Sequence, residues 1–169
     1  GVAARRRLGV AHVPSDRHVA GLWLDASIAT NLVLDRPDVA GRFALRRQAI
    51  REFCMARIAE YDIRPANPDA AVASLSGGNQ QKVLVARELS RNAVHVLLAA
   101  QPTRGVDFAA SATIWTQLQQ AAQRGIAVVL VSSDLDELFA IAHRIVVLRD
   151  GQLVGEIAAI ADDVAQREQ

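Results

Sequence analysis

Cysteine occurs only once in this chain of 169 residues, as Cys54, so no internal disulfide can form. The apolar stretch around Cys54 favours a core position for its thiol, in a reducing compartment. Aromatic residues make up only 4% of the sequence, and Trp23 and Trp115 are interpreted as packing residues. No apolar run approaches the ~20 residues that a membrane-spanning helix needs. These shortages argue against a disulfide-stabilised module and predict no transmembrane segment.

The charges show no strong bias of sign. Lys and Arg together number 19 and Asp and Glu 18, which gives a formal net charge of +1. This balance argues neither for nucleic acid nor for an acidic tail, so no nucleic-acid partner is expected. The four histidines show no metal-ligand spacing, and no metal site of the chain's own is expected. With 51% hydrophobic residues, the composition is that of an ordinary globular domain.

The second half of the chain predicts an α/β fold. Its two short apolar runs are typical of strands that are buried on both faces. Gly125 closes a helical pattern, and Asp150-Gly151 is a strong signal for a β-hairpin. The alternation of strands and helices indicates a parallel sheet with an antiparallel edge. The expected elements are strand 94–99, helix 109–124, strand 126–131, helix 134–142 and a hairpin of residues 144–148 and 152–157.

The first half is predicted to be mainly helical, with loops. Residues 8–13 form a short apolar run before Pro14, which suits a strand that enters a loop. Apolar residues recur at helical spacing over residues 45–61. A further helix is expected from Ser76 to about Ser90, because serine is a good N-cap and the residues that follow are mostly helix formers.

The start of this last helix has the chemistry of an anion site. Gly77 and Gly78 have no Cβ, so the backbone there can come close to a ligand. The first turn of a helix leaves its N–H groups unpaired, and the helix dipole adds partial positive charge. Phosphate suits such a place. A bare Ser-Gly-Gly turn can equally serve only as a helix cap.

The surrounding sequence resembles a known family. Residues 75–82, LSGGNQQK, resemble the signature motif of ABC-type ATPases, in the variant found in the double-domain ATPases of sugar and nucleoside importers. Residues 102–107, PTRGVD, follow about twenty residues later, as this family requires. The resemblance implies a P-loop NTPase-like α/β domain that pairs head to tail with a second ABC ATPase domain around ATP. It assigns these residues to the nucleotide that the partner binds: Ser76, Gly77, Gly78, Asn79 and Gln80.

Two further residues are placed by the resemblance at the contact between the paired domains. Gly105 and Asp107 stand in the loop that meets the partner domain in this family. An aspartate that precedes a helix can also serve as a simple N-cap. The interface role is the favoured prediction for Asp107.

The positions that carry hydrolysis in active members of the family are changed here. Strand 94–99 occupies the Walker B place, and active members continue with Asp-Glu where this chain has Ala100 and Gln101. Alanine has no ligand atom for a metal, and glutamine has no carboxylate to accept a proton from water. Ser133 stands where active members have a histidine that reaches the γ-phosphate. The resemblance therefore implies that ATP is the cofactor, that Mg²⁺ is held mainly by the partner's site, and that this chain alone is inactive.

The P-loop motif GxxxxGK[ST] occurs nowhere in the sequence. In the family it precedes the segment that resembles residues 8–17, so the expectation is an N-terminally truncated ABC ATPase domain. Residues 1–160 are expected to form this partial domain. A helical signature subdomain is expected over about 20–90 and an α/β core over about 92–158, with a tail at 161–169.

Residues 9–18, 21–25, 31–34 and 99–105 are similar to the second ATPase half of nucleoside-type importers, although that subgroup usually has Glu in place of Ser15. The implied function is to couple ATP binding and hydrolysis to nucleoside uptake at the cytoplasmic face of the membrane. The implied partners are transmembrane permease subunits, which dock at residues 20–34, and indirectly a substrate-binding protein. Two alternatives stay open: a ribose- or galactose-type sugar importer, and a non-catalytic regulatory or scaffolding module.

Overall fold

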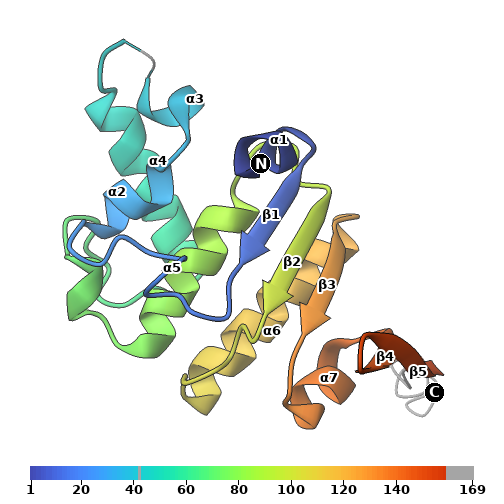
Figure 1. The fold of residues 1–169 in the computed structure, drawn as a ribbon. Helices are drawn as coiled ribbons and strands as arrows, with labels where there is room; N and C mark the ends of the chain where they lie inside the picture. Colours follow the sequence, from blue (N-terminus) through green and yellow to red (C-terminus); the bar gives the residue numbers. More distant parts are fainter. Residues whose placement is uncertain (42, 159–169) are drawn as a thin grey trace, which may run out of the picture.

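The computed structural model describes residues 1–41 and 43–158 (Figure 1). The predicted tail at 161–169 lies outside the described residues. No helix within the described ranges is long and apolar enough to cross a membrane. The elements in chain order are α1 (Val2–Arg7), β1 (Val10–Val13), α2 (Ile28–Val33), α3 (Pro37–Ala40), α4 (Arg47–Glu60), a 3₁₀ turn (Val72–Ser74), α5 (Gly77–Leu89), β2 (Val96–Ala100), α6 (Phe108–Gln123), β3 (Ala127–Val131), α7 (Leu135–Ile141), β4 (Arg144–Arg149) and β5 (Gln152–Ala158).

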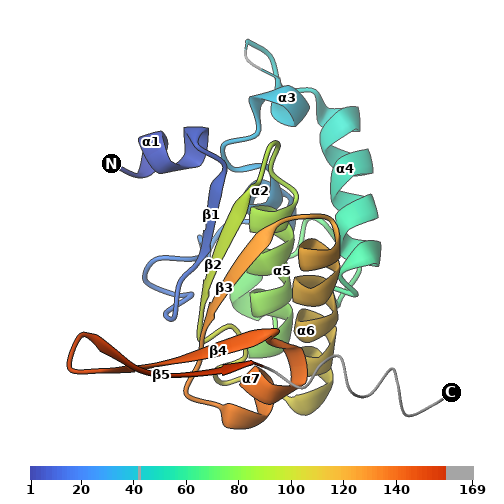
Figure 2. The same cartoon turned by 90° about the vertical axis from the view of Figure 1, so that its right-hand side faces the viewer.

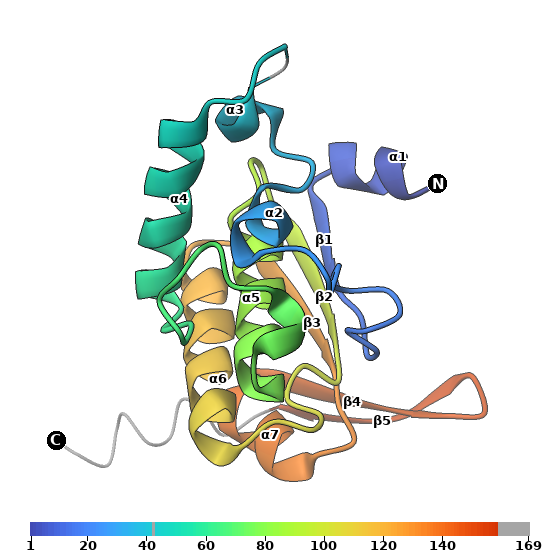
Figure 3. The same cartoon turned by 90° about the vertical axis from the view of Figure 1, so that its left-hand side faces the viewer.

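The centre of the fold is a parallel sheet of three strands in the order β1-β2-β3. Helices α5 and α6 lie against one face of this sheet, as Figures 2 and 3 both show. The register aligns Val13 with Ala99 and Ala99 with Leu130 on that face. Val13 and Ala99 are fully or almost fully buried there. The predicted α/β class is therefore confirmed.

The opposite face of the sheet differs from the sequence prediction. The register places His12, Leu98 and Val129 in one row. Leu98 is 39% exposed and Val129 is 48% exposed. The prediction that these strands are buried on both faces was wrong for the described chain, because α5 and α6 both cover the same face. An apolar run with few polar residues does not reveal which of its two faces is covered.

The C-terminal hairpin has the predicted turn. Asp150 and Gly151 have φ values of 50° and 76°, the left-handed pair that a tight hairpin turn requires. Strands β4 and β5 pair with each other and form a sheet of their own among the described residues. The hairpin is therefore separate from the parallel sheet, whereas the sequence suggested an edge of it.

The helical first half packs around α2. Helix α4 buries Cys54 and Ile58, and α2 contacts both α4 and α5. Burial raises the pKa of the Cys54 thiol to about 11, with a further contribution from Asp69. The predicted core position of Cys54 is therefore confirmed.

A charged cluster ties the segment before α3 to the end of α5. Arg36 is only 8% exposed. Its Nε and Nη2 donate to the two carboxylate oxygens of Asp38 at 2.9 and 2.7 Å, and its Nη1 donates to the carbonyl of Ser90. The Asn92 side chain adds a bond to Asp38 at 3.1 Å. The hydrogen bonds from Arg36 lower the pKa of Asp38 to about 2.

We expect Asp38→Asn to lower the thermal midpoint by about 3–6 °C near neutral pH, since it leaves a buried guanidinium without its carboxylate. The folded pKa is depressed, so this stabilisation is complete above the ordinary value of 3.8 and is lost as the pH falls towards about 2. The difference in thermal midpoint between Asp38→Asn and the parent chain should therefore shrink as the pH falls from 3.8 to about 2. Asp35→Asn is the control, because Asp35 pairs with Arg6 at the surface and should matter little.

Candidate functional site

The N-terminus of α5 presents the exposed hydroxyl of Ser76, and the backbone N–H groups of Gly77 and Gly78 precede the first intrahelical hydrogen bond. Ser76 is the N-cap, and its Oγ accepts from the backbone N and the Nδ2 of Asn79 at 3.4 and 3.0 Å. The side chain of Ser76 is exposed. Because Oγ accepts in both bonds, its own hydrogen is left to donate outward. A donor hydroxyl at the positive end of a helix suits a phosphate oxygen.

The two glycines allow this turn to lie very close to its neighbours. A Cβ on Gly77 would stand 2.7 Å from Nη2 of Arg17 and 3.1 Å from the carbonyl oxygen of Gly105. A Cβ on Gly78 would stand 2.6 Å from the Cβ of Ala110 in α6. The sequence suggested that the glycines admit a ligand. The structure adds a second requirement, which is close packing against residues 101–107 and α6.

The side chains of Asn79 and Gln80 are turned towards the protein. Oδ1 of Asn79 accepts from the backbone N of Arg64 at 2.7 Å. Gln80 is 7% exposed, and its Oε1 lies 3.3 Å from Nε of Arg17 and 2.9 Å from Nε2 of His18. These two residues therefore fix the turn through their side chains. Their backbone N–H groups are engaged as well, that of Asn79 with Oγ of Ser76 at 3.4 Å and that of Gln80 with the carbonyl of Ser76 at 2.9 Å, so they stabilise the turn without facing a ligand directly.

The loop before α6 lies beside this turn. Gly105 has a φ of 68° and Asp107 is the N-cap of α6, where its Oδ1 accepts from the backbone N of Ala110 at 2.9 Å. Both residues are exposed. The structure thus shows the capping role of Asp107, and its proposed contact with a partner domain stays a prediction. The sequence-predicted signature and interface residues are brought together here.

The three changed catalytic positions also meet, at the carboxyl ends of β2 and β3. Ala100 is the last residue of β2 and pairs with Val131. The Oε1 of Gln101 accepts from the backbone N and the Oγ of Ser133 at 3.4 and 3.3 Å. Gln101 itself has a φ of 50°, a strained value for a residue with a side chain.

These residues do not fit a magnesium ion. Ala100 supplies no oxygen, and the single side-chain oxygen of Gln101 is already engaged with Ser133. Hard divalent cations prefer several oxygen ligands, carboxylates above all. In the part of the chain that the structure describes, no group of three or more His, Cys, Asp or Glu side chains is placed to hold a metal.

Glu137 in α7 was missed by the sequence reasoning. It is 0% exposed, and its Oε1 accepts from Thr103 Oγ1 at 2.9 Å and from Trp115 Nε1 at 3.0 Å. It therefore joins α7 and α6 to the loop at 101–107. Trp115 packs against the neighbouring helix through this bond, as predicted. Trp23 is 58% exposed, so the prediction that it is a packing residue was wrong. Helix α7 carries two adjacent acidic residues, Asp136 and Glu137, and the sequence pattern does not tell which of them is buried.

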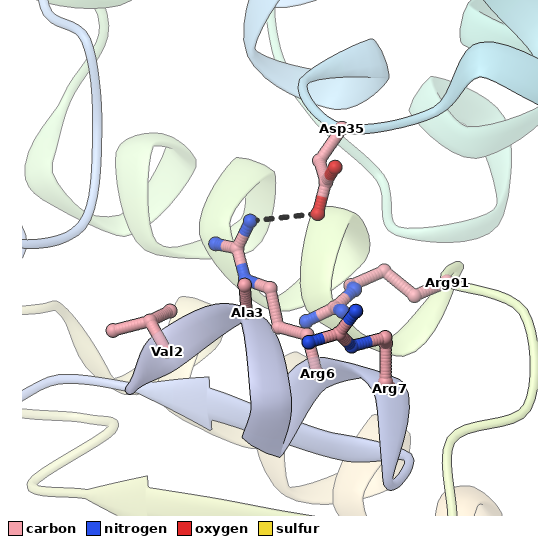
Figure 4. A pocket seen from close by; sticks show the side chains of 6 residues that line it. All are labelled: Val2, Ala3, Arg6, Arg7, Asp35 and Arg91. Atoms are coloured by element: carbon pink, nitrogen blue, oxygen red, sulfur yellow. Dashed lines mark hydrogen bonds and ion pairs between the residues drawn. The ribbon is translucent and has the colours of Figure 1, made fainter.

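A separate hollow of about 500 Å³ lies next to α1 (Figure 4). The run of arginines at 5–7 falls in α1, and Arg6 and Arg7 line this hollow together with Arg91. Arg6 is paired with Asp35 at 2.8 Å and Arg91 with Glu88 at 3.3 Å. Since Arg91 follows the end of α5, the hollow lies at the opposite end of that helix from Ser76. It forms no part of the candidate site.

We expect Gly78→Ala to lower the free energy of unfolding by about 1–3 kcal/mol, because the added methyl overpacks the contact with Ala110. The double variant Gly78→Ala with Ala110→Gly should recover part of this loss in chemical denaturation. Ala110→Gly alone measures the cost of a glycine within α6. If the double variant is no more stable than the sum of the single effects predicts, the contact between the two helices is not the cause.

Comparison with known proteins shows which proteins the chain resembles. No family model matches the chain. The nucleoside import ATP-binding protein NupA of Lactococcus lactis subsp. cremoris is 40% identical over 152 residues, which cover 88% of this chain and 30% of the relative. The arabinose import ATP-binding protein AraG 2 of Burkholderia cenocepacia is 39% identical over 154 residues, or 90% of this chain and 30% of the relative. The chain thus spans about 30% of the length of these relatives.

A solved structure shows the same fold. The ATP-binding cassette MJ0796, in a dimeric post-hydrolysis state bound to ADP and Pi, superposes with a TM-score of 0.75 at 22% identity. The match covers 93% of this chain and 66% of that cassette. The described chain therefore has the fold of an ABC ATPase cassette over most of its length.

Proposed function

We propose that this chain, whose homologues are the ATP-binding proteins of ABC importers, supplies the signature side of an ATP sandwich to a second ATPase domain. The observation that carries the proposal is the geometry at Ser76. Its exposed hydroxyl and the first-turn amides of α5 form a donor surface beside Gly105 and Asp107. The terminal phosphate of an ATP bound to the partner is the anion that this surface fits.

In this proposal, this chain and the partner domain contribute unequally to ATP hydrolysis. Ala100 and Gln101 give this chain neither a metal ligand nor a carboxylate base at the end of β2. Mg²⁺ and the groups that activate water belong to the partner's site in this proposal. Ser76 contacts the nucleotide bound to the partner, and this nucleotide is the one hydrolysed. A nucleotide at the carboxyl end of this chain's own β2 is hydrolysed slowly or not at all.

The proposed cellular role is nucleoside import at the cytoplasmic face of the membrane. The partners would be transmembrane permease subunits and, indirectly, a substrate-binding protein. Trp23, 58% exposed, and Val19, 85% exposed, present apolar surface in and next to the segment 20–34 that would dock on the permease. A sugar importer is the second candidate, supported by the similar identity to the arabinose import protein.

The test uses a hybrid in which this chain replaces the matching 152 residues of the Lactococcus relative. We expect Ser76→Ala in the hybrid to reduce the ATP hydrolysis rate by about 100-fold, the effect of removing one donor to a developing charge. Gln101→Ala should leave the rate within about twofold, since the side chain performs no proton transfer. An equal loss from both substitutions would contradict the asymmetric scheme.

The 169-residue chain on its own should show no measurable ATP hydrolysis and only weak ATP affinity. It has no P-loop to hold the α- and β-phosphates, so only the surface at Ser76 remains for binding. Isothermal titration with ATP and MgCl₂ measures the affinity. Tight, magnesium-dependent binding would overturn the proposed division of roles.

A further inference from the structure

Arg17 connects two elements that are distant in the sequence. It lies in the loop between β1 and α2. Its Nε donates to Oε1 of Gln80 in α5 at 3.3 Å, and its Nη1 donates to the carbonyl of Arg104 at 3.1 Å. One planar guanidinium therefore links helix α5 to the loop at 101–107. The fixed fork of an arginine suits such a bridge, because its donors point in different directions in one plane.

Gly77 lies directly under this bridge. A Cβ at position 77 would stand 2.7 Å from Nη2 and 3.6 Å from Cζ of Arg17. Any side chain there would displace the guanidinium from its two acceptors. The absence of a side chain at Gly77 is thus a requirement of the arginine bridge, independent of any ligand.

The acceptors of Arg17 are all neutral. Among the ion pairs formed within residues 1–41 and 43–158, none includes Arg17. The adjacent Asp16 is occupied by the backbone N–H groups of His18 and Val19 at 2.9 and 3.1 Å. Arg17 thus lies near the N-terminus of α5 without an ion pair, and the helix dipole disfavours a cation there. An arriving anion would relieve this repulsion.

The Arg17 contacts continue into a polar cluster centred on the Gln80 side chain. Oε1 of Gln80 accepts hydrogen bonds from Nε of Arg17 and Nε2 of His18. Nε2 of Gln80 donates to the carbonyl of Val72 at 3.2 Å. Both Oε1 and Nε2 of this buried amide are therefore engaged. These bonds fix the Gln80 side chain and hold Arg17 in one orientation over the first turn of α5.

We propose that Arg17 is a positioning residue for the signature site. It holds the first turn of α5, and with it Ser76, in register with the loop of Gly105 and Asp107 that faces the partner. Closure over the partner's phosphate would then engage both surfaces as one unit. The consequence for ATP rests on the proposed function, whereas the bridge itself does not.

The bridge is tested first in the 169-residue chain by a double-mutant cycle on the thermal midpoint. We expect Gly77→Ala to lower the midpoint by about 3–8 °C when Arg17 is present. In an Arg17→Met background the same substitution should cost less than half as much, because the displaced group is gone and alanine is the better helix former. Additive effects would show that the two residues are not coupled and would overturn the proposal.

The positioning role is then tested in the hybrid with the Lactococcus relative. Arg17→Met should raise the KM for ATP about tenfold and change kcat by less than about threefold, as expected for weakened closure. Arg17→Lys should not restore the KM, since one ammonium cannot reproduce the guanidinium fork. Arg51→Met is the charge-matched control, because Arg51 is 63% exposed and its ion pair with Asp69 is long, at 3.9 Å.

Two results would overturn the positioning role. Full restoration by lysine would show that only the charge matters, and an unchanged KM would reduce Arg17 to a structural residue. Ser76→Ala in the same hybrid separates this failure from that of the proposed function. If Ser76→Ala has no effect, the signature assignment fails, and the cycle in the 169-residue chain still decides whether the bridge exists.

Discussion

The close approach of the first turn of α5 to the loop at 101–107 is the contact on which the candidate site depends. It is possible only because positions 77 and 78 have no side chains, which leaves room for Arg17 on one side and Ala110 on the other. The contact sets Ser76 beside Gly105 and leaves its hydroxyl exposed. A glycine pair costs helix stability, and here that cost is offset by packing that a larger residue would prevent.

The loop at 101–107 is held from both sides by polar side chains that are wholly or partly buried. Arg17 bonds the carbonyl of Arg104 on the α5 side, and Glu137 bonds Thr103 on the α7 side. A third contact, between Gln101 and Ser133, fixes the start of the loop to the end of β3. These three contacts fix the loop to the Arg17 segment, to α7 and to the end of β3, so the residues proposed to meet the partner have a defined position relative to the candidate phosphate surface.

The proposed division of roles between this chain and a second ATPase domain rests on what the two ends of the fold offer chemically. Helices α5 and α6 cover one face, and Leu98 and Val129 on the other face stay partly exposed within the described chain. The carboxyl ends of β2 and β3 present Ala100, Gln101 and Ser133, whose side chains satisfy one another or bear no polar group. The carboxyl ends of β2 and β3 can therefore anchor loops. The hydrogen-bond donors that suit a phosphate lie instead at the N-terminus of α5.

The sequence by itself determined strand β1, helices α4 and α5, the elements of the second half, the hairpin turn at Asp150-Gly151 and the motif at Ser76–Gly78, because these depend on local periodicity, capping and backbone freedom. The resemblance to ABC ATPases, rather than local pattern, grouped Ala100, Gln101 and Ser133. Only the tertiary structure decided that one face of the sheet is covered, that the hairpin stands apart, and that Arg17 and Glu137 join the site. Burial and long-range hydrogen bonds depend on which surfaces meet in space, and the spacing of residues along the chain carries little record of that.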